Sequence, residues 1–395
     1  MKLAALFLIS LVSLGTAELP LDVVTPSGYT KLRSWANCSL YRIEAETTYD
    51  YAPLLIHLPG SRYDIGYGYG YLLANEIAEN YQSLMKSLLG DKWYDGLLME
   101  TVALALDWQW TDYLLDVCGV GEQDGGGVPV LSSQSRLEQR HWSQQAQGLT
   151  VHEANLEENE ITFGGFPWTL RLRYIMEFSS DLLEGRTLWA STNNTVGFNH
   201  MIASAPDAEA YHQGTSSGPV AYALETMYQY TAYFPDNDPR EANAMYNDSG
   251  TTVHIGFPMK EAVWRTNHGY DPVIREHYEW SQSPSSWSMQ RYMFIHDALA
   301  TYQTEGKPIG YMEAVNITAI AGDKGKDPYI CQNNTNGTNV LSVTFEPNDQ
   351  TLYVAWERST GVNWRPATCS AYLKLSLRDW FALKPPLNFD VKTVL

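Results

Sequence analysis

The sequence predicts a single large domain of the α+β or α/β class, in which helices lie outside layered sheets. Short segments of strand type alternate along the chain with segments whose apolar residues recur at helical spacing. The stretch NVLSVTFEPNDQTLYVAWE holds two alternating runs around a Pro-Asn-Asp turn, which predicts a β-hairpin. No linker of distinct composition divides the 395 residues. Locally paired strands interleaved with amphipathic helices exclude a helix bundle and a closed barrel.

The expected elements begin with strands over residues 38–45 and 51–58 and a long helix over 63–89. That helix carries apolar residues every three or four positions, namely Ile65, Tyr69, Leu72, Leu73, Ile77, Tyr81, Leu84 and Leu88. Later strands are expected over 149–154, 161–163, 196–203, 252–255 and 262–266. Later helices are expected over 171–177, 181–189 and 289–301.

Residues 1–17 have the pattern of a signal peptide. Lys2 precedes an apolar run, and the small residues Gly15 and Ala17 predict cleavage after Ala17. No later apolar segment has the length of a membrane span, and the ending LKPPLNFDVKTVL carries neither a lipid-anchor tail nor a retention signal. We therefore expect a mature domain over 18–395 that is soluble and either secreted or lysosomal.

Glycosylation sequons support the secretory pathway. An asparagine followed by X-Ser/Thr without an intervening proline is the acceptor pattern for N-linked glycans, which require an exposed site. The chain has six such positions, Asn37, Asn193, Asn247, Asn316, Asn333 and Asn336. The sequence therefore predicts a glycoprotein.

The charge of the chain argues against a polyanionic partner. Lys and Arg number 26 against 45 Asp and Glu, which gives a net charge of −19 and a pI near 4.8. A surface of this sign repels phosphate backbones, so nucleic acid is excluded as a partner. An acidic surface also suits an acidic compartment, where carboxylates begin to protonate.

Four cysteines are too few to staple a chain of this length, so its core must stabilise it. Cys331 and Cys369 lie close together near the C-terminus, and we expect them to form a disulfide. For the other two, the sequence leaves two alternatives open: Cys38 pairs with Cys118, or Cys118 is free.

Two motifs do not support the chemistry they superficially resemble. The GYGYG run at 66–70 lacks the Lys-Ser/Thr ending of a phosphate loop and lies in a helical pattern, where glycines permit close packing. His152-Glu153 is not followed by a histidine at the spacing of zinc proteases, and the other histidines form no ligand cluster. We expect neither a metal nor a cofactor.

A serine-esterase mechanism is the less favoured alternative. GTSSG at 214–218 matches the G-x-S-x-G pattern around Ser216, with Asp271 and either His277 or His296 downstream in triad order. A nucleophile elbow, however, needs a buried strand immediately before the serine and a helix after it. EAYHQ precedes this motif, so an ordinary polar turn is favoured.

A family resemblance comes from six segments and their order. These are SRYDIGYGYGYLLANEI, ITFGGFPWTLRLRYIME, DLLEGRTLW, NNTVGFNHMIASA, WRTNHGYDP and SVTFEPNDQTLYVAW. Together they resemble the isopenicillin N acyltransferase-like family of N-terminal-nucleophile hydrolases, in its secreted, acid ceramidase-like eukaryotic branch. The resemblance covers most of residues 40–380.

The resemblance implies a four-layer αββα sandwich and an enzyme that processes itself. In this family the chain cuts the peptide bond before a cysteine, and the new terminal amine then serves as that cysteine's base. An acyl group passes to the thiolate and onward to water or an amine. The implied substrate is a small N-acyl amide or a lipid-like amide.

Three residues take catalytic roles by this resemblance. Asn267 in TNH matches a side-chain amide donor of the oxyanion hole, although TNH also fits a strand-ending turn. Arg291 in SMQRYMFIHDAL matches an arginine that lies beside the nucleophile, although it also fits a solvated helix arginine. Cys118 takes the place of the nucleophile, which divides the chain into segments 18–117 and 118–395.

The region around Cys118 departs from the family pattern. GVGEQ, the turn DGGG and the strand-like VPVLSS follow Cys118 and imitate the nucleophile hairpin. The supporting Arg-Asn-x-Asp segment is missing, with Arg136 its only remnant, and QQAQ replaces the Asn-Glu pair expected before GLTVHEANL. In an alternative alignment, GVGEQDGGGV is a preceding helix and the nucleophile hairpin is deleted. The sequence thus leaves two functions open: a cysteine amidase or acyltransferase, and an inactive relative that acts as a binding or structural glycoprotein.

Overall fold

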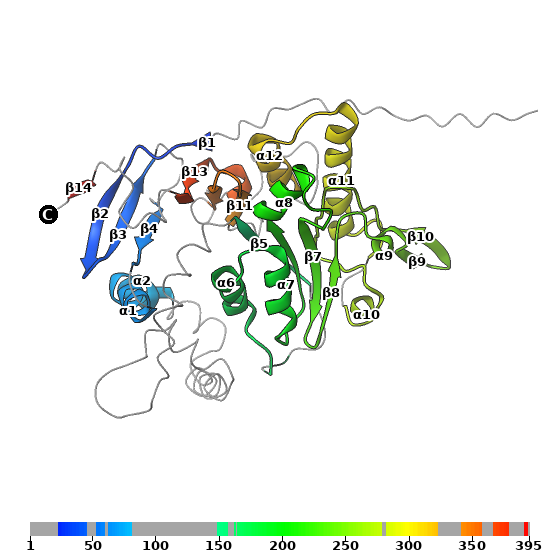
Figure 1. Cartoon of the computed structure of the whole chain (residues 1–395), viewed down its shortest axis with the longest axis horizontal. Helices are drawn as coiled ribbons and strands as arrows, with labels where there is room; N and C mark the ends of the chain where they lie inside the picture. Colours follow the sequence, from blue (N-terminus) through cyan, green and yellow to red (C-terminus); the bar gives the residue numbers. More distant parts are fainter. Residues whose placement is uncertain are drawn as a thin grey trace, which may run out of the picture.

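The computed structural model describes residues 23–45, 53–59, 62–80, 148–156, 162, 164–278, 282–322, 341–357, 366–378 and 391–393. Within these ranges the chain has an α+β fold, built of helices and mostly antiparallel sheets (Figure 1). The described strands form three four-stranded sheets and one two-stranded hairpin. The predicted signal peptide lies outside the described residues. None of the described helices combines the length and apolar character that a membrane-spanning helix requires.

The sheet that positions the candidate site is antiparallel, in the order β5-β6-β7-β8. Its strands are β5 (Leu149–Asn155), β6 (Phe198–Ser204), β7 (Ala221–Met227) and β8 (Tyr230–Phe234). Because residues paired across an antiparallel sheet point to the same face, the register defines two sets of side chains. His200, Leu224 and Tyr233 share one face, whereas Asn199 and Glu225 share the other.

Helices α6 (Trp168–Phe178) and α7 (Leu182–Ala190) cover the first face (Figure 1). The N-cap Asp181 begins α7, because its side chain accepts a hydrogen bond from the backbone N–H of Glu184. A buried apolar cluster joins both helices to the sheet: Leu149, Ile175, Leu182, Trp189, Ile202 and Leu224.

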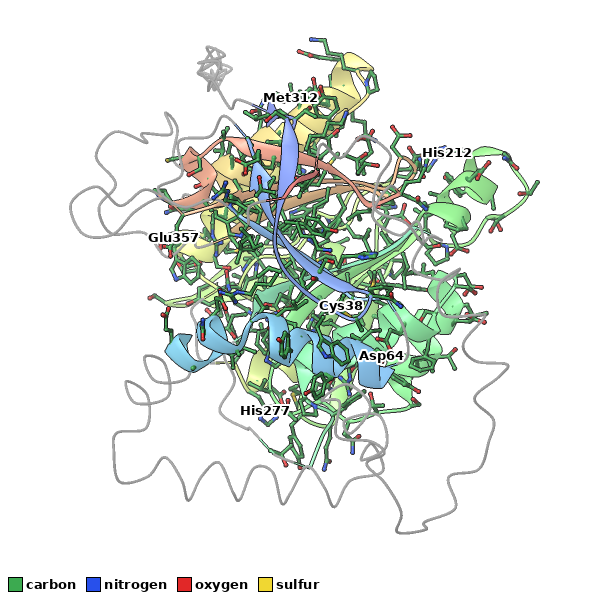
Figure 2. All side chains as sticks on the ribbon, turned by 90° about the vertical axis from the view of Figure 1, so that its left-hand side faces the viewer. Cys38, Asp64, His212, His277, Met312 and Glu357 are labelled. Atoms are coloured by element: carbon green, nitrogen blue, oxygen red, sulfur yellow. The ribbon has the colours of Figure 1, made fainter. Side chains whose placement is uncertain are left out.

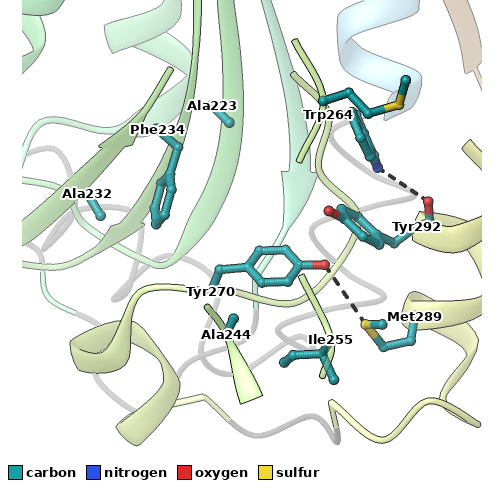
Figure 3. Packing of buried hydrophobic residues seen from close by; sticks show 10 residues of the cluster. Ala223, Ala232, Phe234, Ala244, Ile255, Trp264, Tyr270, Met289 and Tyr292 are labelled. Carbon is teal, nitrogen blue, oxygen red and sulfur yellow. Dashed lines mark hydrogen bonds between the residues drawn. The ribbon is translucent and has the colours of Figure 1, made fainter. Parts of the chain in front are cut away.

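The second face packs against residues 255–271, which form no regular strand, and against α11 (Trp287–Glu305). Ser286 caps the N-terminus of α11, and Gly306, with a φ of 63°, ends it in the left-handed conformation. Figure 3 shows the core between them, in which Tyr270 and Tyr292 lie beside Phe234 and Trp264. This core holds α11 at a fixed place over the sheet.

The other two sheets pack against each other. One has the order β1 (Val23–Val24), β13 (Tyr372–Ser376), β12 (Thr351–Trp356) and β11 (Leu341–Glu346). The other has the order β14 (Val391–Thr393), β2 (Gly28–Trp35), β3 (Cys38–Glu44) and β4 (Leu54–His57). Ile43, Val354, Leu373 and Leu375 form the core between them.

Helices close this pair of sheets on both outer faces. Val315 and Ala319 of α12 (Tyr311–Gly322) pack on Tyr353 and Tyr372 of the first sheet. Leu72 of α1 (Arg62–Leu72), which precedes α2 (Ala74–Asn80), packs on Cys38 and Leu40 of the second. The local order of layers is therefore helix, sheet, sheet, helix.

The remaining described elements are short. Helices α8 (Ala205–His212), α9 (Pro239–Ala242) and α10 (Pro272–Glu276) connect the larger parts, and residues Ala367–Cys369 form a 3₁₀ turn. Strands β9 (Met245–Asp248) and β10 (Thr251–His254) form a separate hairpin.

Most predicted elements are confirmed, with shifted boundaries. The strands expected at 38–45, 51–58, 149–154, 196–203 and 252–255 are β3, β4, β5, β6 and β10, and the expected C-terminal hairpin is β11 and β12. The helices expected at 171–177, 181–189 and 289–301 are α6, α7 and α11. The helix expected at 63–89 divides into α1 and α2 within the described residues.

The strand expected at 262–266 is wrong, because these residues lie outside any strand apart from one isolated bridge between Met259 and Ala262. Asn199 explains the difference. Its side-chain amide donates to the backbone carbonyls of Thr266 (2.6 Å) and His268 (2.9 Å), so a side chain takes the place of a strand partner. Of the strand expected at 161–163, residue 162 is in no strand and the other two residues lie outside the described ranges.

Candidate functional site

Residues 264–271 form a segment that is buried except for one side chain, that of Asn267, which is partly exposed. The exposed fraction is 6 % for Trp264, 5 % for Arg265 and 0 % for His268, and the other neighbours are equally buried. Asn267 alone is half-buried. The segment therefore presents Asn267 from a rigid, buried base.

An ion network holds the backbone of this segment. Arg265 donates through Nε to Glu225 and through Nη1 to Glu241, both at 2.8 Å and with all three side chains buried. The second oxygen of Glu225 accepts from the backbone N–H groups of Tyr270 (2.7 Å) and Asp271 (2.8 Å). Burial lowers the pKa of Arg265, but Glu241 and Glu225 more than compensate and hold it above its ordinary value.

Four further contacts fix Asn267 itself. Its backbone N–H donates to Ser288 Oγ (2.7 Å), and its carbonyl accepts from the Tyr278 hydroxyl. Its Nδ2 donates to the carbonyl of Asn155 at the end of β5 (2.7 Å), and its Oδ1 accepts from Arg291 Nη2. Because arginine only donates and a carbonyl only accepts, these partners define the orientation of the amide. Among the described residues, the second hydrogen of Nδ2 has no acceptor.

Arg291 adds positive charge beside that amide. Its guanidinium lies 4.3 Å above the centre of the Trp287 ring, and its Nε has no hydrogen-bond partner among the described residues. Burial lowers the pKa of Arg291 to about 10, so the group is protonated at neutral and acidic pH. Trp287 is 38 % exposed, which places the pair at the edge of the protein surface. An amide N–H beside a guanidinium can stabilise an oxyanion.

A serine and a histidine lie close together beneath Asn267, but they do not form a catalytic dyad. Ser288 Oγ lies 2.7 Å from His268 Nδ1, and His268 Nε2 lies 2.7 Å from the Tyr270 hydroxyl. Both residues are at most 1 % exposed, so no substrate reaches them. Burial, reinforced by Arg265, lowers the pKa of His268 to about 3, which keeps the ring neutral. The pair supports Asn267 from below.

The structure brings two of the three predicted catalytic residues together. Asn267 and Arg291 are in direct contact, although they are far apart in the sequence. Cys118 lies outside the described residues, as does Arg136. Sequence reasoning missed Ser288 and Tyr278, which hold the Asn267 backbone. Ser288 belongs to the polar run SPSSWS at the start of α11, which reads as a helix cap, so the pattern gives no signal for this second role.

Two of the four cysteines, Cys38 and Cys369, lie in the described part of the chain. Cys38 is a free, buried thiol whose sulfur lies 3.7 Å from the backbone carbonyl oxygen of Asp64. Figure 2 labels both residues. Cys118 lies outside the described residues, so its own state stays a prediction. Cys369 is disulfide-bonded. Its predicted partner, Cys331, lies outside the described residues, and that pairing stays a prediction.

The surroundings of Cys38 also explain one glycine of the GYGYG run. A Cβ at Gly68 would lie 2.7 Å from the Cys38 sulfur, so α1 needs a glycine there to pack on β3. The predicted packing role is confirmed at Gly68, whereas a Cβ at Gly70 would meet nothing within 4 Å.

Ser216 does not lie in a nucleophile elbow. The GTSSG turn follows helix α8 and precedes strand β7, which reverses the order of elements that an elbow requires. Ser216 is exposed, and its hydroxyl accepts from the backbone N–H of Gly218 (3.1 Å). The turn is an ordinary polar connection.

The sequons occupy different environments. Asn37, Asn193 and Asn247 are exposed, as a glycan requires. Asn316 is half-buried within α12, and Asn333 and Asn336 lie outside the described residues. Glycosylation at all six stays a prediction.

Among the residues in the described ranges, no group of three or more His, Cys, Asp or Glu side chains comes together as a set of metal ligands. No protein-family model matches the chain, and no curated protein matches it significantly.

Proposed function

We propose that the chain is a secreted or lysosomal amide hydrolase or acyltransferase of the N-terminal-nucleophile type, acting on an N-acyl substrate. The observation that carries this proposal is the contact between Asn267 and Arg291, two residues that the family resemblance selected independently. Within the described ranges one N–H of the amide has no acceptor, and the guanidinium beside it is positively charged. Both features are what an oxyanion hole needs.

In the proposed reaction, cleavage of the Val117–Cys118 bond first exposes the amine of Cys118. That amine takes the thiol proton, and the sulfur attacks the carbonyl carbon of the substrate amide. The negative oxygen of the tetrahedral intermediate accepts a hydrogen bond from Asn267 Nδ2, with Arg291 adding charge. The carbon–nitrogen bond then breaks, and the departing amine takes the proton from the Cys118 amine. Water or a second amine attacks the resulting thioester and restores the thiol.

Two structural observations support the family assignment. Around the paired sheets the layers follow the order helix, sheet, sheet, helix, which agrees with a four-layer αββα sandwich. Cys38 is a free, buried thiol, in keeping with a mechanism in which Cys118 is not bridged to it.

The test is the covalent state of the mature protein. Purified from a secretory host, deglycosylated and reduced, the protein should separate on a denaturing gel into residues 18–117 and 118–395, with Cys118 at the N-terminus of the larger fragment. Cys118→Ala should abolish both the cleavage and the hydrolysis of fluorogenic N-acyl amides, because one side chain performs both reactions. Cys118→Ser should cleave more slowly, since a hydroxyl is the weaker nucleophile. An intact chain that still hydrolyses amides contradicts the mechanism.

The second candidate is an inactive relative with a binding or structural role. The missing Arg-Asn-x-Asp segment and the replacement of the Asn-Glu pair by QQAQ favour it. An intact, inactive chain with a normal fold would support this second function. Sequencing of the transcript between Cys118 and Gly148 then determines whether the nucleophile hairpin has been lost.

A further inference from the structure

Arg171 on α6 is a buried cation on the side of the β5–β8 sheet away from the candidate site. It is 1 % exposed. Its guanidinium donates to the Asn194 side-chain oxygen and to the Asn193 carbonyl, and it lies 4.9 Å above the centre of the Trp189 ring. All of these partners are electrically neutral.

No carboxylate compensates this charge in the described part of the chain. Burial lowers the pKa of Arg171 to about 10, and the phenol of Tyr233 is the group that opposes this effect. Burying a charged group without an opposite charge costs several kcal/mol, on the order of the stability of a whole domain. The group remains protonated at physiological pH, so the charge needs another partner.

Three hydrogen-bond donors around Arg171 are also without partners among the described residues. They are Arg171 Nε, Trp189 Nε1 and the Tyr233 hydroxyl, and each is buried. Such groups are rare in folded proteins and each needs an explanation. The donors come from α6, α7 and β8, so they approach one region from three elements.

Contacts of these side chains connect the three residues: the Arg171 guanidinium lies over the Trp189 ring, and Arg171 and Tyr233 influence each other's pKa. The ring centres of Trp189 and His200 lie 4.6 Å apart. Burial is the larger cause that lowers the pKa of His200, and the charge of Arg171 lowers it further. His200 and Tyr233 lie on one row across the sheet, each paired with Leu224. A second cation, Arg186, lies 4.9 Å above the centre of the Tyr233 ring.

We propose that Arg171, Trp189 and Tyr233 form a binding site for a monoatomic anion, chloride in the secretory pathway, between α6, α7 and the sheet. A halide accepts several N–H and O–H hydrogen bonds at once, and it neutralises the guanidinium, which water does not. The nearly complete burial of Arg171, Trp189 and His200 excludes a substrate-sized ligand.

The first experiment measures thermal stability in chloride and in gluconate at equal ionic strength, using the whole glycosylated chain. A ligand that binds the folded state raises the melting temperature with the logarithm of its concentration. The wild type should melt several degrees higher in chloride. Arg171→Met should remove this difference, whereas Arg42→Met, a matched control at an exposed arginine of β3 in another sheet, should retain it.

A second variant and a direct measurement guard against misfolding. Trp189→Phe keeps the ring but removes the N–H, and it should shift the halide response to higher concentration. A crystal soaked in bromide should show an anomalous peak within hydrogen-bond distance of Arg171 Nε. Equal melting temperatures in both salts, or a water in place of the bromide peak, would overturn the proposal.

Discussion

The two faces of the β5–β8 sheet each bury an arginine, and they neutralise it in opposite ways. On the face that carries the candidate site, Arg265 lies between Glu225 and Glu241. On the helical face, the partners of Arg171 among the described residues are a side-chain amide oxygen, a backbone carbonyl and an aromatic ring. The pKa of Arg265 is held above its ordinary value, whereas that of Arg171 is lowered to about 10. The same residue type therefore meets two different electrostatic environments across one layer of strands.

The two arginine environments differ because one face of the sheet supports irregular backbone and the other supports helices. Residues 255–271 run over the sheet without ladder hydrogen bonds, so their backbone depends on side chains such as Glu225 and Asn199. The helices on the other face satisfy their own backbones and pack through apolar residues. A buried ion network thus appears where irregular backbone must be positioned accurately, and that backbone carries Asn267.

The largest expected effect is that of removing the paired cation. Arg265→Met removes the cation that pairs with two buried carboxylates and should lower the free energy of unfolding by about 3 to 5 kcal/mol. Arg171→Met removes the donor to the Asn194 side-chain oxygen, whereas the Asn193 carbonyl keeps the hydrogen bond from the Phe166 backbone N–H, and it should cost about 1 to 3 kcal/mol. Urea denaturation of both variants under one salt condition measures the difference. An equal loss of unfolding free energy in the two variants would show that the carboxylates do not make Arg265 more stabilising than Arg171.

The next prediction is that substitution of Asn267 lowers turnover, whereas substitution of a buried neighbour lowers stability. If the protein is active, Asn267→Ala should lower turnover by about 2.7 to 4 kcal/mol of transition-state stabilisation. Its melting temperature should stay nearly unchanged, because the side chain is half-buried and lies at the edge of the network. His268→Ala, directly beside it and fully buried, should lower stability instead. Full activity in Asn267→Ala would make the oxyanion assignment wrong.

A smaller effect is expected at one glycine on each side of the sheet. A Cβ at Gly165 would lie 2.0 Å from the Asn194 carbonyl oxygen, and a Cβ at Gly256 would lie 1.7 Å from that of Glu241. Alanine at either position forces the backbone apart and should destabilise the fold by about 1 to 3 kcal/mol. Gly70→Ala, which meets nothing within 4 Å, is the control and should be neutral or slightly stabilising. Calorimetry of the three variants makes the comparison.

The last prediction concerns the response to acid, which changes the free energy of unfolding by the smallest amount per pH unit. It arises because each face of the sheet contains a buried neutral histidine. Burial and then Arg171 lower the pKa of His200 to about 3, and burial and then Arg265 do the same for His268. The unfolded chain takes up a proton on each near pH 6.5, whereas the folded chain does not. The stabilisation is therefore complete above pH 6.5 and is lost as pH falls toward 3, by about 1.4 kcal/mol per pH unit for each histidine.

His200→Phe and His268→Gln should each flatten the dependence of the unfolding free energy on pH between 6.5 and 4, relative to the wild type. Because other titrating groups are common to the three proteins, the slope difference reports the single histidine. Parallel curves would contradict the assignment of these groups as neutral in the folded state.

The sequence predicted well those elements that have one buried face. Helices α6, α7 and α11 and strands β3, β5 and β6 show the expected periodicity, and the Pro-Asn-Asp turn located β11 and β12. Strand β7 was missed because AYALETM is buried on both faces over most of its length and shows no alternation. Strand β8, which pairs with it, was also missed. The strand expected at 262–266 is wrong, and at its end the Asn199 side chain bonds the carbonyls of Thr266 and His268, a distant contact that no local pattern reveals.

The candidate site shows the same division. The TNH motif and the arginine of α11 could be selected from the chain, because a family resemblance marked both positions. Their supports could not: Tyr278, Ser288 and the Asn155 carbonyl reach Asn267 from three separate elements, and each belongs to a segment with an ordinary local pattern. Tertiary contacts of this kind depend on how the elements pack and not on local sequence.

The two paired sheets combine strands from opposite ends of the chain. Strand β1 runs parallel to β13, and β14 runs parallel to β2, so each sheet includes strands from both sides of position 118. A cut before Cys118 would therefore leave two polypeptides that share both sheets and the apolar core between them. The two polypeptides would stay associated, so the processed form would have the hydrodynamic size of the precursor. The shorter polypeptide would be a permanent subunit and not a released propeptide. Neither piece could complete these sheets alone: β2, β3 and β4 pair locally, but β1 needs β13 and the free edge of β2 needs β14 from the far end of the chain.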